Sequence, residues 1–195
     1  MIIDMHMHEM RYSGDSFLRL ENMVEIAKRR GLDGICITDH DSMGLKEFAA
    51  EYSEKTEFPI FVGIEFYSLQ GDIVAFGIED YPKERIPAQE FVDLVQAQGG
   101  MCFSAHPFRN NNRGLEENLK IVKGLDGIEV LNGSTLYEAN RKAAEYAAEL
   151  GLATVGSSDC HVPEKLGIYA TYFPREIRSV QELIRSVKRD SSGVL

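Results

Sequence analysis

The sequence predicts an α/β protein with a mainly parallel sheet closed into a barrel. Short β-branched runs alternate with longer amphipathic segments along most of the chain, which is the order typical of βα units. Two joints, "RRGLDGICI" at 29–37 and "VKGLDGIEV" at 122–130, repeat one pattern: basic residues late in a helix, a glycine stop and an apolar strand. The large number of such units favours a closed barrel over an open five-stranded sheet.

The individual strands and helices follow from the apolar runs and the amphipathic segments. The predicted strands are short apolar runs, and they cover residues 1–6, 34–38, 60–66, 73–78, 101–105, 127–131, 153–157 and 167–173. The predicted helices are the amphipathic segments between most of these runs, at 20–30, 45–55, 88–98, 116–123, 137–150 and 180–189. Because 195 residues suit one core, we expect a single domain over 1–195, with residues 190–195 as a frayed tail.

Composition restricts the function classes. A hydrophobic share of 44% and a charged share of 27% are typical of a soluble globular protein, and no apolar run is long enough to span a bilayer. The net charge of −10 argues against a nucleic-acid partner beyond a short nucleotide substrate, although acids that bind cations would permit an anionic substrate. The three scattered cysteines and the lack of a signal peptide indicate a cytoplasmic protein without disulfides. Oligomeric state is not predicted.

The histidines occupy equivalent places in the predicted fold. All five lie at or just beyond the carboxyl end of a predicted strand: His6, His8, His40, His106 and His161. Acidic residues accompany them at the same ends: Asp4, Asp39, Glu65, Glu129 and Asp159. A single histidine at a strand end is more often structural than functional, but five in equivalent places are hard to ascribe to chance. In a parallel barrel these ends meet on the face that carries the chemistry.

The first strand shows the pattern most clearly. In "DMHMH" (4–8), the period of two sends Asp4, His6 and His8 to one side and Met5 and Met7 to the other, outward under the helices. Buried polar groups on the inner side would be costly unless they are paired or bind a metal. Imidazole and carboxylate ligands suit zinc, manganese or iron.

Two other interpretations of these strand ends are weaker. Cys160 lies between Asp159 and His161, but alternation turns it away from them and into the core. A serine triad at Ser104 or Ser158 lacks the strand–turn–helix context of a nucleophile elbow.

An ordered set of motifs resembles the polymerase-and-histidinol-phosphatase (PHP) family. The motifs are "DMHMH" (4–8), "TDHD" (38–41), "GIE" (63–65), "AHPFR" (105–109), "IEVLNG" (128–133) and "SSDCH" (157–161). The resemblance covers nearly the whole chain. It implies a distorted (β/α)7 TIM-like barrel that holds two or three divalent metal ions, manganese, zinc or iron, at its C-terminal mouth and hydrolyses phosphoesters.

The resemblance also implies roles for particular residues. One metal would be held by His6, His8, Glu65 and Asp159. Glu65 would bridge to a second metal shared with His106, and His40 and His161 would hold a third. Asp4 and Asp39 would orient imidazoles or water, although Asp4 can equally cap the strand end by hydrogen bonding.

Three features depart from the fullest family pattern. The third-metal site often takes a further side chain soon after the HxH motif; here the candidate is Asp15, which can equally cap the helix that follows. The second metal often takes a histidine just before the strand after Glu65, whereas "GDIVAFG" offers Asp72, an oxygen ligand that favours manganese or iron. The short segment between Gly77 and His106 lacks the insertion of some nucleotide-hydrolysing members, so we expect an open pocket.

The predicted function is that of a metal-dependent phosphoric ester hydrolase acting on a small phosphorylated metabolite or nucleotide. The metals would activate a water for in-line attack on phosphorus. Arg109 and Arg113 would bind the phosphate, unless they are only surface residues of a polar loop. Two alternatives remain: an amidohydrolase-like enzyme, which usually needs a bridging modified lysine that no strand end supplies, and a non-catalytic metal-bound module.

Overall fold

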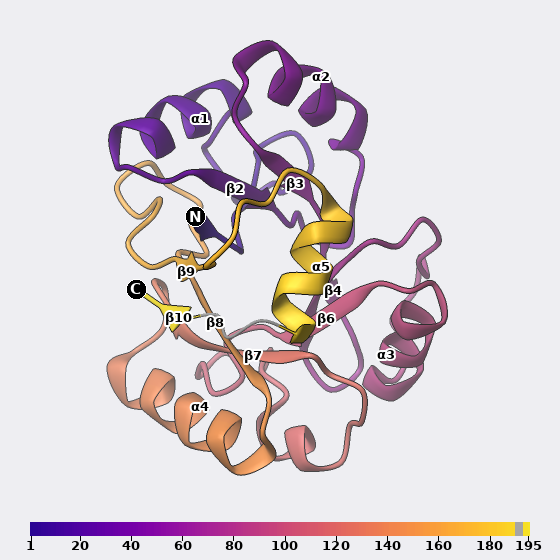
Figure 1. The fold of residues 1–195 in the computed structure, drawn as a ribbon. Coiled ribbons are helices and arrows are strands. Elements are labelled where there is room, and N and C mark those ends of the chain that lie inside the picture. The colour runs from indigo at the N-terminus through magenta and orange to yellow at the C-terminus, as the bar shows by residue number, and fades with distance from the viewer. Residues whose placement is uncertain (190–192) are drawn as a thin grey trace.

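The computed structural model, which describes residues 1–189 and 193–195, contains two mixed five-stranded sheets (Figure 1). The first sheet has the strand order β10 (Gly193–Val194), β9 (Thr171–Tyr172), β1 (Ile2–Asp4), β2 (Gly34–Ile37), β3 (Ile60–Val62). The second has the order β4 (Ile64–Tyr67), β5 (Asp72–Phe76), β6 (Met101–Ser104), β7 (Gly127–Asn132), β8 (Ala153–Ser157).

The predicted closed (β/α)7 barrel is wrong for the described residues. Strands β1, β2 and β3 pair in parallel, as do β6, β7 and β8, but β5, β9 and β10 pair antiparallel with their neighbours. Among the described residues, two isolated backbone bridges lie outside the strands, Met7 with Cys160 and His40 with Glu65. The α/β class is therefore retained, but the strands are divided between two sheets.

The break between the sheets falls at Gly63. We expected one strand over 60–66, but the chain leaves β3 at Val62 and enters β4 at Ile64. Gly63 donates its N–H to the carbonyl of Ile37 at 2.9 Å. A Cβ at Gly63 would lie 2.4 Å from the carbonyl oxygen of Ala75, so only glycine fits where the chain changes sheets.

The antiparallel direction of β5 follows from the short connection before it. Only residues 68–71 separate β4 from β5, whereas parallel neighbours need a crossover of about a dozen residues. Ser68 closes this turn, because its N–H donates to the carbonyl of Gly71 at 3.1 Å. One consequence is that the first residue of β5, Asp72, lies at the same edge as the last residues of the parallel strands.

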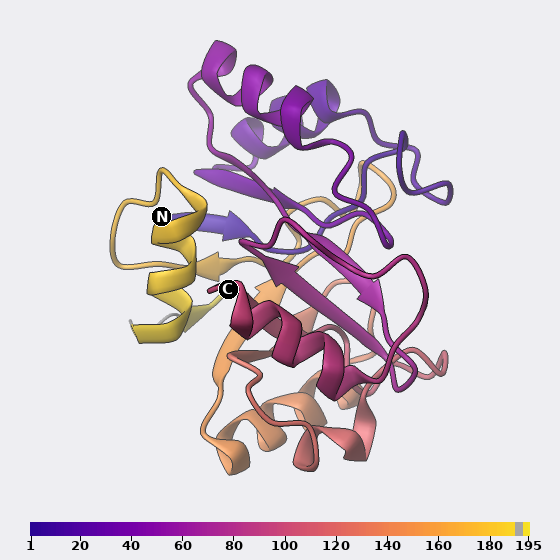
Figure 2. The same ribbon diagram turned by 90° about the vertical axis from the view of Figure 1, so that its right-hand side faces the viewer.

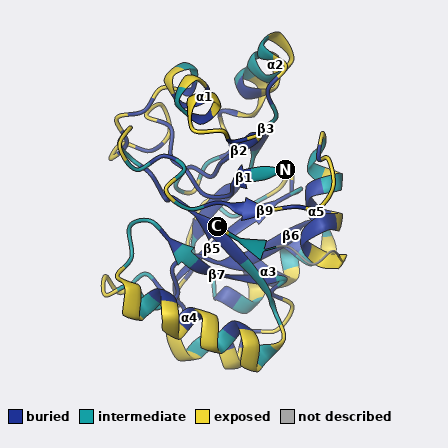
Figure 3. Cartoon of the chain, turned by 60° about the vertical axis from the view of Figure 1, so that its left-hand side comes forward, coloured by how far each residue is buried: buried dark blue, intermediate teal, exposed yellow. Residues whose placement is uncertain are grey.

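The helices cover the outer faces of the sheets. α1 (Leu20–Arg29) and α2 (Lys46–Thr56) pack on the first sheet, while α3 (Ala88–Ala97) and α4 (Tyr137–Leu150) pack on the second (Figures 1 and 2). α1 buries Leu20, Met23, Val24 and Ala27, a spacing that forms one face of a helix. The outward faces of these helices are exposed (Figure 3).

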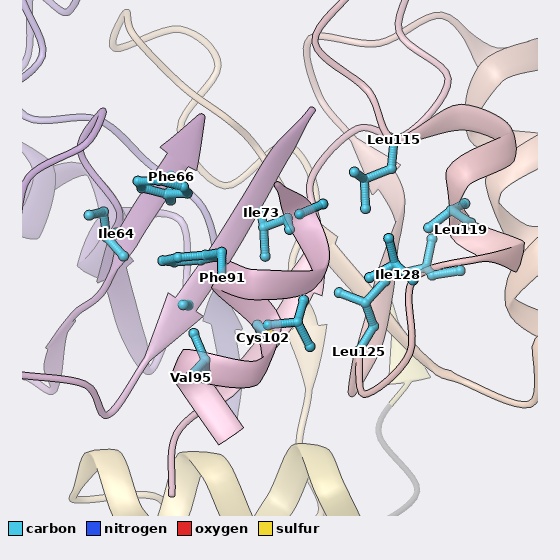
Figure 4. Close-up of a cluster of buried hydrophobic side chains, with 14 of the residues drawn as sticks. Ile64, Phe66, Ile73, Phe91, Val95, Cys102, Leu115, Leu119, Leu125 and Ile128 are labelled. Atoms are coloured by element: carbon cyan, nitrogen blue, oxygen red, sulfur yellow. The ribbon is translucent and has the colours of Figure 1, made fainter. Parts of the chain in front are cut away.

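Three apolar clusters form the core. One lies under α1 and α2 and includes Met7 and Cys160, and another lies under α3 and α4. In the latter the rings of Phe66 and Phe91 stack with centroids 4.1 Å apart (Figure 4). The third contains residues of both sheets, such as Ile3 and Phe103, together with Met5 and side chains of α5 (Val180–Arg189). Met5 and Met7 therefore enter different clusters, and the predicted outward packing is correct only for Met7.

Two further elements differ from expectation. The helix predicted over 116–123 is a short 3-10 turn, η1 (Glu116–Lys120). Within the expected tail, Gly193 and Val194 form β10 and pair with Tyr172 and Thr171, while 190–192 lie outside the described residues. No helix in the described part of the chain is long and apolar enough to cross a membrane.

Candidate metal site

Polar side chains from both sheets converge at one edge. His6 and His8 follow β1, His40 follows β2, and Glu65 lies in β4. His106 follows β6, and Asp159 and His161 follow β8. A cavity of about 120 Å³ opens among them and is lined by Asp15, His40, Glu65, Asp72, His106, Arg109, Asn111, Arg113, Asp159 and His161. The structure thus brings together the predicted ligand residues from distant parts of the chain.

Glu65 lies at the centre of this cluster. Its Oε1 is 2.9 Å from Nε2 of His106 and 3.3 Å from Nε2 of His6. Its Oε2 is 2.7 Å from Nδ1 of His40 and 3.6 Å from Nε2 of His8. One carboxylate therefore reaches four imidazoles, and its two oxygens face different pairs of them. This is the geometry that a carboxylate needs in order to bridge two cations.

A carboxylate holds the ring of His6 through its Nδ1 atom. Its Nδ1 lies 3.1 Å from Oε1 of Glu129, which leaves Nε2 directed at Glu65 and Asp159. Glu129 Oε2 also accepts the backbone N–H of His106 at 2.6 Å. A carboxylate behind a histidine fixes the orientation of the ring and raises its basicity, as is common for metal ligands.

The backbone at two of the predicted ligand residues is strained. His106 and Asp159 adopt φ values of +27° and +48°, a region that residues other than glycine rarely occupy. The hydrogen bond from the His106 N–H to Glu129 helps to hold the first of these conformations. Such strain concentrates where a functional side chain must be aimed in one direction.

The charges suit bound cations. Burial alone would raise the pKa of Glu65, but His6 and hydrogen bonds from His106 and His40 hold that pKa well below its usual range. Burial likewise opposes ionisation of Asp159, yet His6 and His8 keep its pKa well below its usual range. Both carboxylates are therefore ionised. Burial lowers the pKa of His8 to about 4, so this imidazole is neutral, which is the form that binds a metal.

Donor atoms in this cluster come close enough to share cations. The groups whose ligand atoms lie within 4.8 Å of one another are His6–His8–Glu65, His6–His106–Asp159, Glu65–Asp72–His106 and His8–His40–His161. Imidazoles that release their proton on binding and ionised carboxylates are donors that zinc, manganese and iron accept. The residues present fit a site for divalent metals, and Asp72 lies in the same group as Glu65 and His106, where the sequence places it.

Each of the two arginines on the cavity wall is bonded to a carboxylate. Arg109 Nη2 donates to Asp159, and its Nε donates to Thr135 Oγ1 at 3.0 Å. Arg113 forms two parallel bonds to Asp72, at 2.6 and 2.9 Å. Burial and the charge of Glu65 raise the pKa of Asp72 to about 6 despite Arg113. Neither arginine is therefore a free surface residue.

Asp4 and Asp39 both lie behind the cluster. Asp4 accepts the backbone N–H groups of Ser158 and Gly167 at 2.9 and 3.0 Å, so it ties the first strand to the loops after β8. Asp39 accepts the N–H of Glu9 and the hydroxyl of Ser13, which in turn contacts His8 Nδ1 at 3.1 Å. Asp39 thus supports His8 through Ser13, while Asp4 orders backbone rather than an imidazole.

Asp15 reaches the outer histidines. Its Oδ2 lies 3.2 Å from Nε2 of His40 and 3.4 Å from Nε2 of His161, and its side chain is 59% exposed. The alternative role as a helix cap is wrong, because α1 begins only at Leu20 with Arg19 at its cap position. Neither Ser104 nor Ser158 donates its hydroxyl to a histidine, so a serine triad is absent among these residues.

Two buried residues without a predicted role, Glu129 and Asn132, join this cluster. Asn132 Nδ2 donates to Glu129 at 2.9 Å and to Asp159 at 3.2 Å, and its Oδ1 accepts from Arg109 at 2.6 Å. The signal was present: an acid and an amide interrupt the apolar strand "GIEVLN", and both are fully buried. A buried carboxylate within a strand indicates a partner that carries positive charge or donates hydrogen bonds.

Fold and site together define an α/β protein with a histidine–carboxylate pocket of the kind that binds divalent metals. A family model described as PHP-associated matches residues 137–192. This match and the ordered motifs make the chain similar to proteins of the PHP family.

Known proteins of similar sequence and fold come from several organisms. The uncharacterized protein MJ1587 of Methanocaldococcus jannaschii is 27% identical over 140 residues, which cover 66% of this chain and 80% of the relative. A protein assigned as a metal-dependent phosphoesterase from Bifidobacterium adolescentis has a TM-score of 0.71 at 20% identity, over 85% of this chain and 91% of the other.

Two further solved structures share the fold. An amidohydrolase from Chromobacterium violaceum, with bound sulfate and no metal, has a TM-score of 0.69 at 21% identity over 85% of this chain and 89% of its own. The lesion-specific endonuclease PfuEndoQ from Pyrococcus furiosus has a TM-score of 0.72 at 17% identity, over 99% of this chain but 57% of its own. At these identities the likeness establishes the fold alone.

Proposed function

We propose that this protein is a PHP-type metal-dependent hydrolase that cleaves the phosphoester bond of a small phosphorylated metabolite or nucleotide at a centre of two or three metals. The observation that carries the proposal is the position of Glu65, whose two carboxylate oxygens face four imidazoles. Divalent metals bound there supply Lewis acidity and lower the pKa of water. The phosphoesterase assignment of the Bifidobacterium neighbour agrees with this reaction class.

The residues around those metals have two proposed roles, as metal ligands and as groups that orient the ligands. His6, His8, Glu65 and Asp159 are the proposed ligands of one metal, Glu65, Asp72 and His106 of a second, and His40 and His161 with His8 or Asp15 of a third. Glu129 holds His6 in place through Nδ1, so that Nε2 stays directed inward. Asp39 supports His8 through Ser13 in the same way.

Arg109 and Arg113 are the proposed phosphate contacts. Both line the cavity, and a guanidinium matches the spacing of two phosphate oxygens. Asp159 and Asp72, to which they are bonded here, are also proposed metal ligands. A carboxylate that binds a metal accepts less strongly from arginine, so metal loading would free each guanidinium to contact the substrate.

Amidohydrolase chemistry is less favoured, although one neighbour of similar fold is an amidohydrolase. The residues that line the cavity include two arginines but no lysine, so none of them can supply a bridging modified lysine. The net charge of −10 also disfavours a long polyanion such as the substrate of an endonuclease.

A substrate panel tests the proposal. Phosphomonoesters, phosphodiesters, amides and a short oligonucleotide are incubated with protein loaded with Mn²⁺, Zn²⁺ or Fe²⁺, and release of phosphate or amine is followed. We expect phosphate release with at least one metal, and none after chelation. Hydrolysis of amides alone would indicate the amidohydrolase alternative, and bound metal without any hydrolysis would indicate a non-catalytic module.

A further inference from the structure

The metal cavity is small. Its volume is about 120 Å³, and the proposed metal ligands Glu65, Asp72, His106 and Asp159 line it. A phosphoryl group bound by the metals would lie among these residues. The group esterified to the phosphate would then extend from the cavity along an adjoining surface.

A groove of about 670 Å³ adjoins the cavity and shares Arg109 with it. The groove runs between the loop after β6 and the first turn of α4. Its volume lies in the range of small-molecule sites. Thr135, which accepts a hydrogen bond from Arg109 Nε at 3.0 Å, also lines the groove, so the groove and the arginine of the metal cavity are directly connected.

The groove has an apolar wall. Phe108, Leu136 and Ala139 line it, and the side chain of Leu136 is 79% exposed. The ring of Phe108 is fixed in place, since it packs edge-on against Tyr146 at 4.8 Å and Lys142 Nζ lies 4.2 Å from its centroid. A rigid aromatic side chain beside an exposed leucine suits a flat apolar group.

The cations of the groove are already paired, and two carboxylates, Glu116 and Glu138, also line it. Arg109 bonds to Asp159, Lys142 lies 3.3 Å from Glu117, and Glu138 lies 3.0 Å from Arg141. These cations therefore offer little to a second anionic group, and the carboxylates of Glu116 and Glu138 would repel one. The chemistry of the groove thus favours an uncharged occupant.

We propose that this groove binds the leaving group of the substrate, and that this group is uncharged and carries a flat ring, as an arylmethyl alcohol or a nucleoside does. The inference rests on the proposed function. Hydrolysis would break the bond between phosphorus and the ester oxygen and leave the oxygen of water on phosphorus. The ring-bearing alcohol would then be released with a proton from that water.

Binding of two matched phosphonates tests the groove without turnover. Benzylphosphonate and methylphosphonate share the phosphate-like head, and only the first carries a ring. With the Mn²⁺-loaded protein we expect benzylphosphonate to bind about tenfold more tightly by calorimetry, since burial of part of a ring removes apolar surface from water. Ala139→Trp, which fills the groove, should abolish this preference, and Leu136→Ala should reduce it about threefold.

Matched controls lie away from the groove. Ala144→Trp places the same ring on another exposed position of α4, and Ile121→Ala truncates another side chain that is 71% exposed. Both should keep the wild-type preference. Equal affinity of the wild type for the two phosphonates would overturn the proposal, as would a preference that survives in both Ala139→Trp and Leu136→Ala.

Hydrolysis of the corresponding esters separates this inference from the proposed function. Preferred turnover of benzyl phosphate over methyl phosphate supports both. Equal kcat/KM for the two esters would overturn the proposed role of the groove and would still support the phosphoesterase activity. Ring-dependent binding of the phosphonates without hydrolysis of either ester would support the groove as a ligand site and would overturn the proposed phosphoesterase activity.

Discussion

Oε1 of Glu65 lies 2.9 Å from Nε2 of His106, although 41 positions separate the two residues in the chain. Glu65 comes from β4 and His106 follows β6, and antiparallel β5 lies between these strands. The hairpin that reverses β5 also brings Asp72 to the same edge, where Asp72 Oδ2 is 3.6 Å from His106 Nε2. The departure from a parallel barrel is thus what assembles the group of Glu65, Asp72 and His106.

Glu129 should control metal affinity although it does not face the cavity. Its Oε1 is 3.1 Å from Nδ1 of His6, and its Oε2 accepts from the His106 N–H and Asn132 Nδ2. In Glu129→Gln one oxygen becomes an NH₂ group that faces these donors, so the ring of His6 loses its fixed orientation. We expect metal affinity to fall about 10- to 100-fold, as measured by chelator competition. Glu145→Gln, at an exposed position of α4, is the control, and an unchanged affinity in Glu129→Gln would contradict this role.

Arg113 should affect both substrate binding and, through Asp72, metal binding. Because lysine cannot reproduce the two parallel bonds to Asp72, Arg113→Lys should raise KM for a phosphoester about tenfold or more and weaken binding of one metal. Arg85→Lys is a matched control. Arg113 and Arg85 both lie over the ring of Tyr67, at 4.4 and 3.6 Å, but Arg85 bonds to the Ser68 carbonyl outside the cavity. The role is wrong if the two variants have the same KM.

The metal-free protein should lose stability in alkaline solution through His40. Burial would lower the pKa of His40, but its hydrogen bond to Glu65 and the charges of Glu65 and Asp15 raise it to about 9. A folded pKa above the unfolded value of about 6.5 stabilises the protein fully below that value, and this contribution is lost as the pH rises through 9. We expect a loss of about 3 kcal/mol in the free energy of unfolding, from urea titrations at pH 6 and pH 10 after chelation.

His40→Asn provides the comparison for this pH effect. The variant lacks the titrating imidazole but keeps the other ionisable groups, so its loss between the two pH values should be smaller by about the same 3 kcal/mol. An equal loss in wild type and variant would show that His40 is not the group responsible.

Gly63 should be required for the passage from β3 to β4. In Gly63→Ala the new Cβ would meet the Ala75 carbonyl at 2.4 Å and the ring of Phe76 at 2.7 Å, so backbone must shift. We expect the free energy of unfolding to fall by about 2 kcal/mol or more, measured with urea. At Gly14 nothing lies within 4 Å of the added methyl, and Gly14→Ala should stay within about 0.5 kcal/mol of wild type. Equal stability of the two variants would refute this account of the sheet break.

The sequence predicts the metal pocket better than the sheets. The placement of His6, His40 and His106 depends only on where strands end, which local hydrophobic patterns report. The division of the strands at Gly63 depends on a close contact with Ala75, and the direction of β5 depends on a four-residue turn. The apolar periodicity of the sequence reports neither of these features. The link between Glu129 and His6 spans 123 positions and was equally inaccessible, although the acid within an apolar strand marks the place.

Elemental analysis of Glu65→Gln tests the central claim most directly. The side chain is fully buried among imidazoles, and glutamine keeps its shape while removing the charge and one acceptor oxygen that a bridge between two metals requires. The account predicts that the wild type holds at least two divalent metals per chain. In Glu65→Gln the metal content and the phosphoesterase activity should fall together, with an unchanged circular dichroism spectrum. Wild-type metal content and activity in the folded variant would contradict the account.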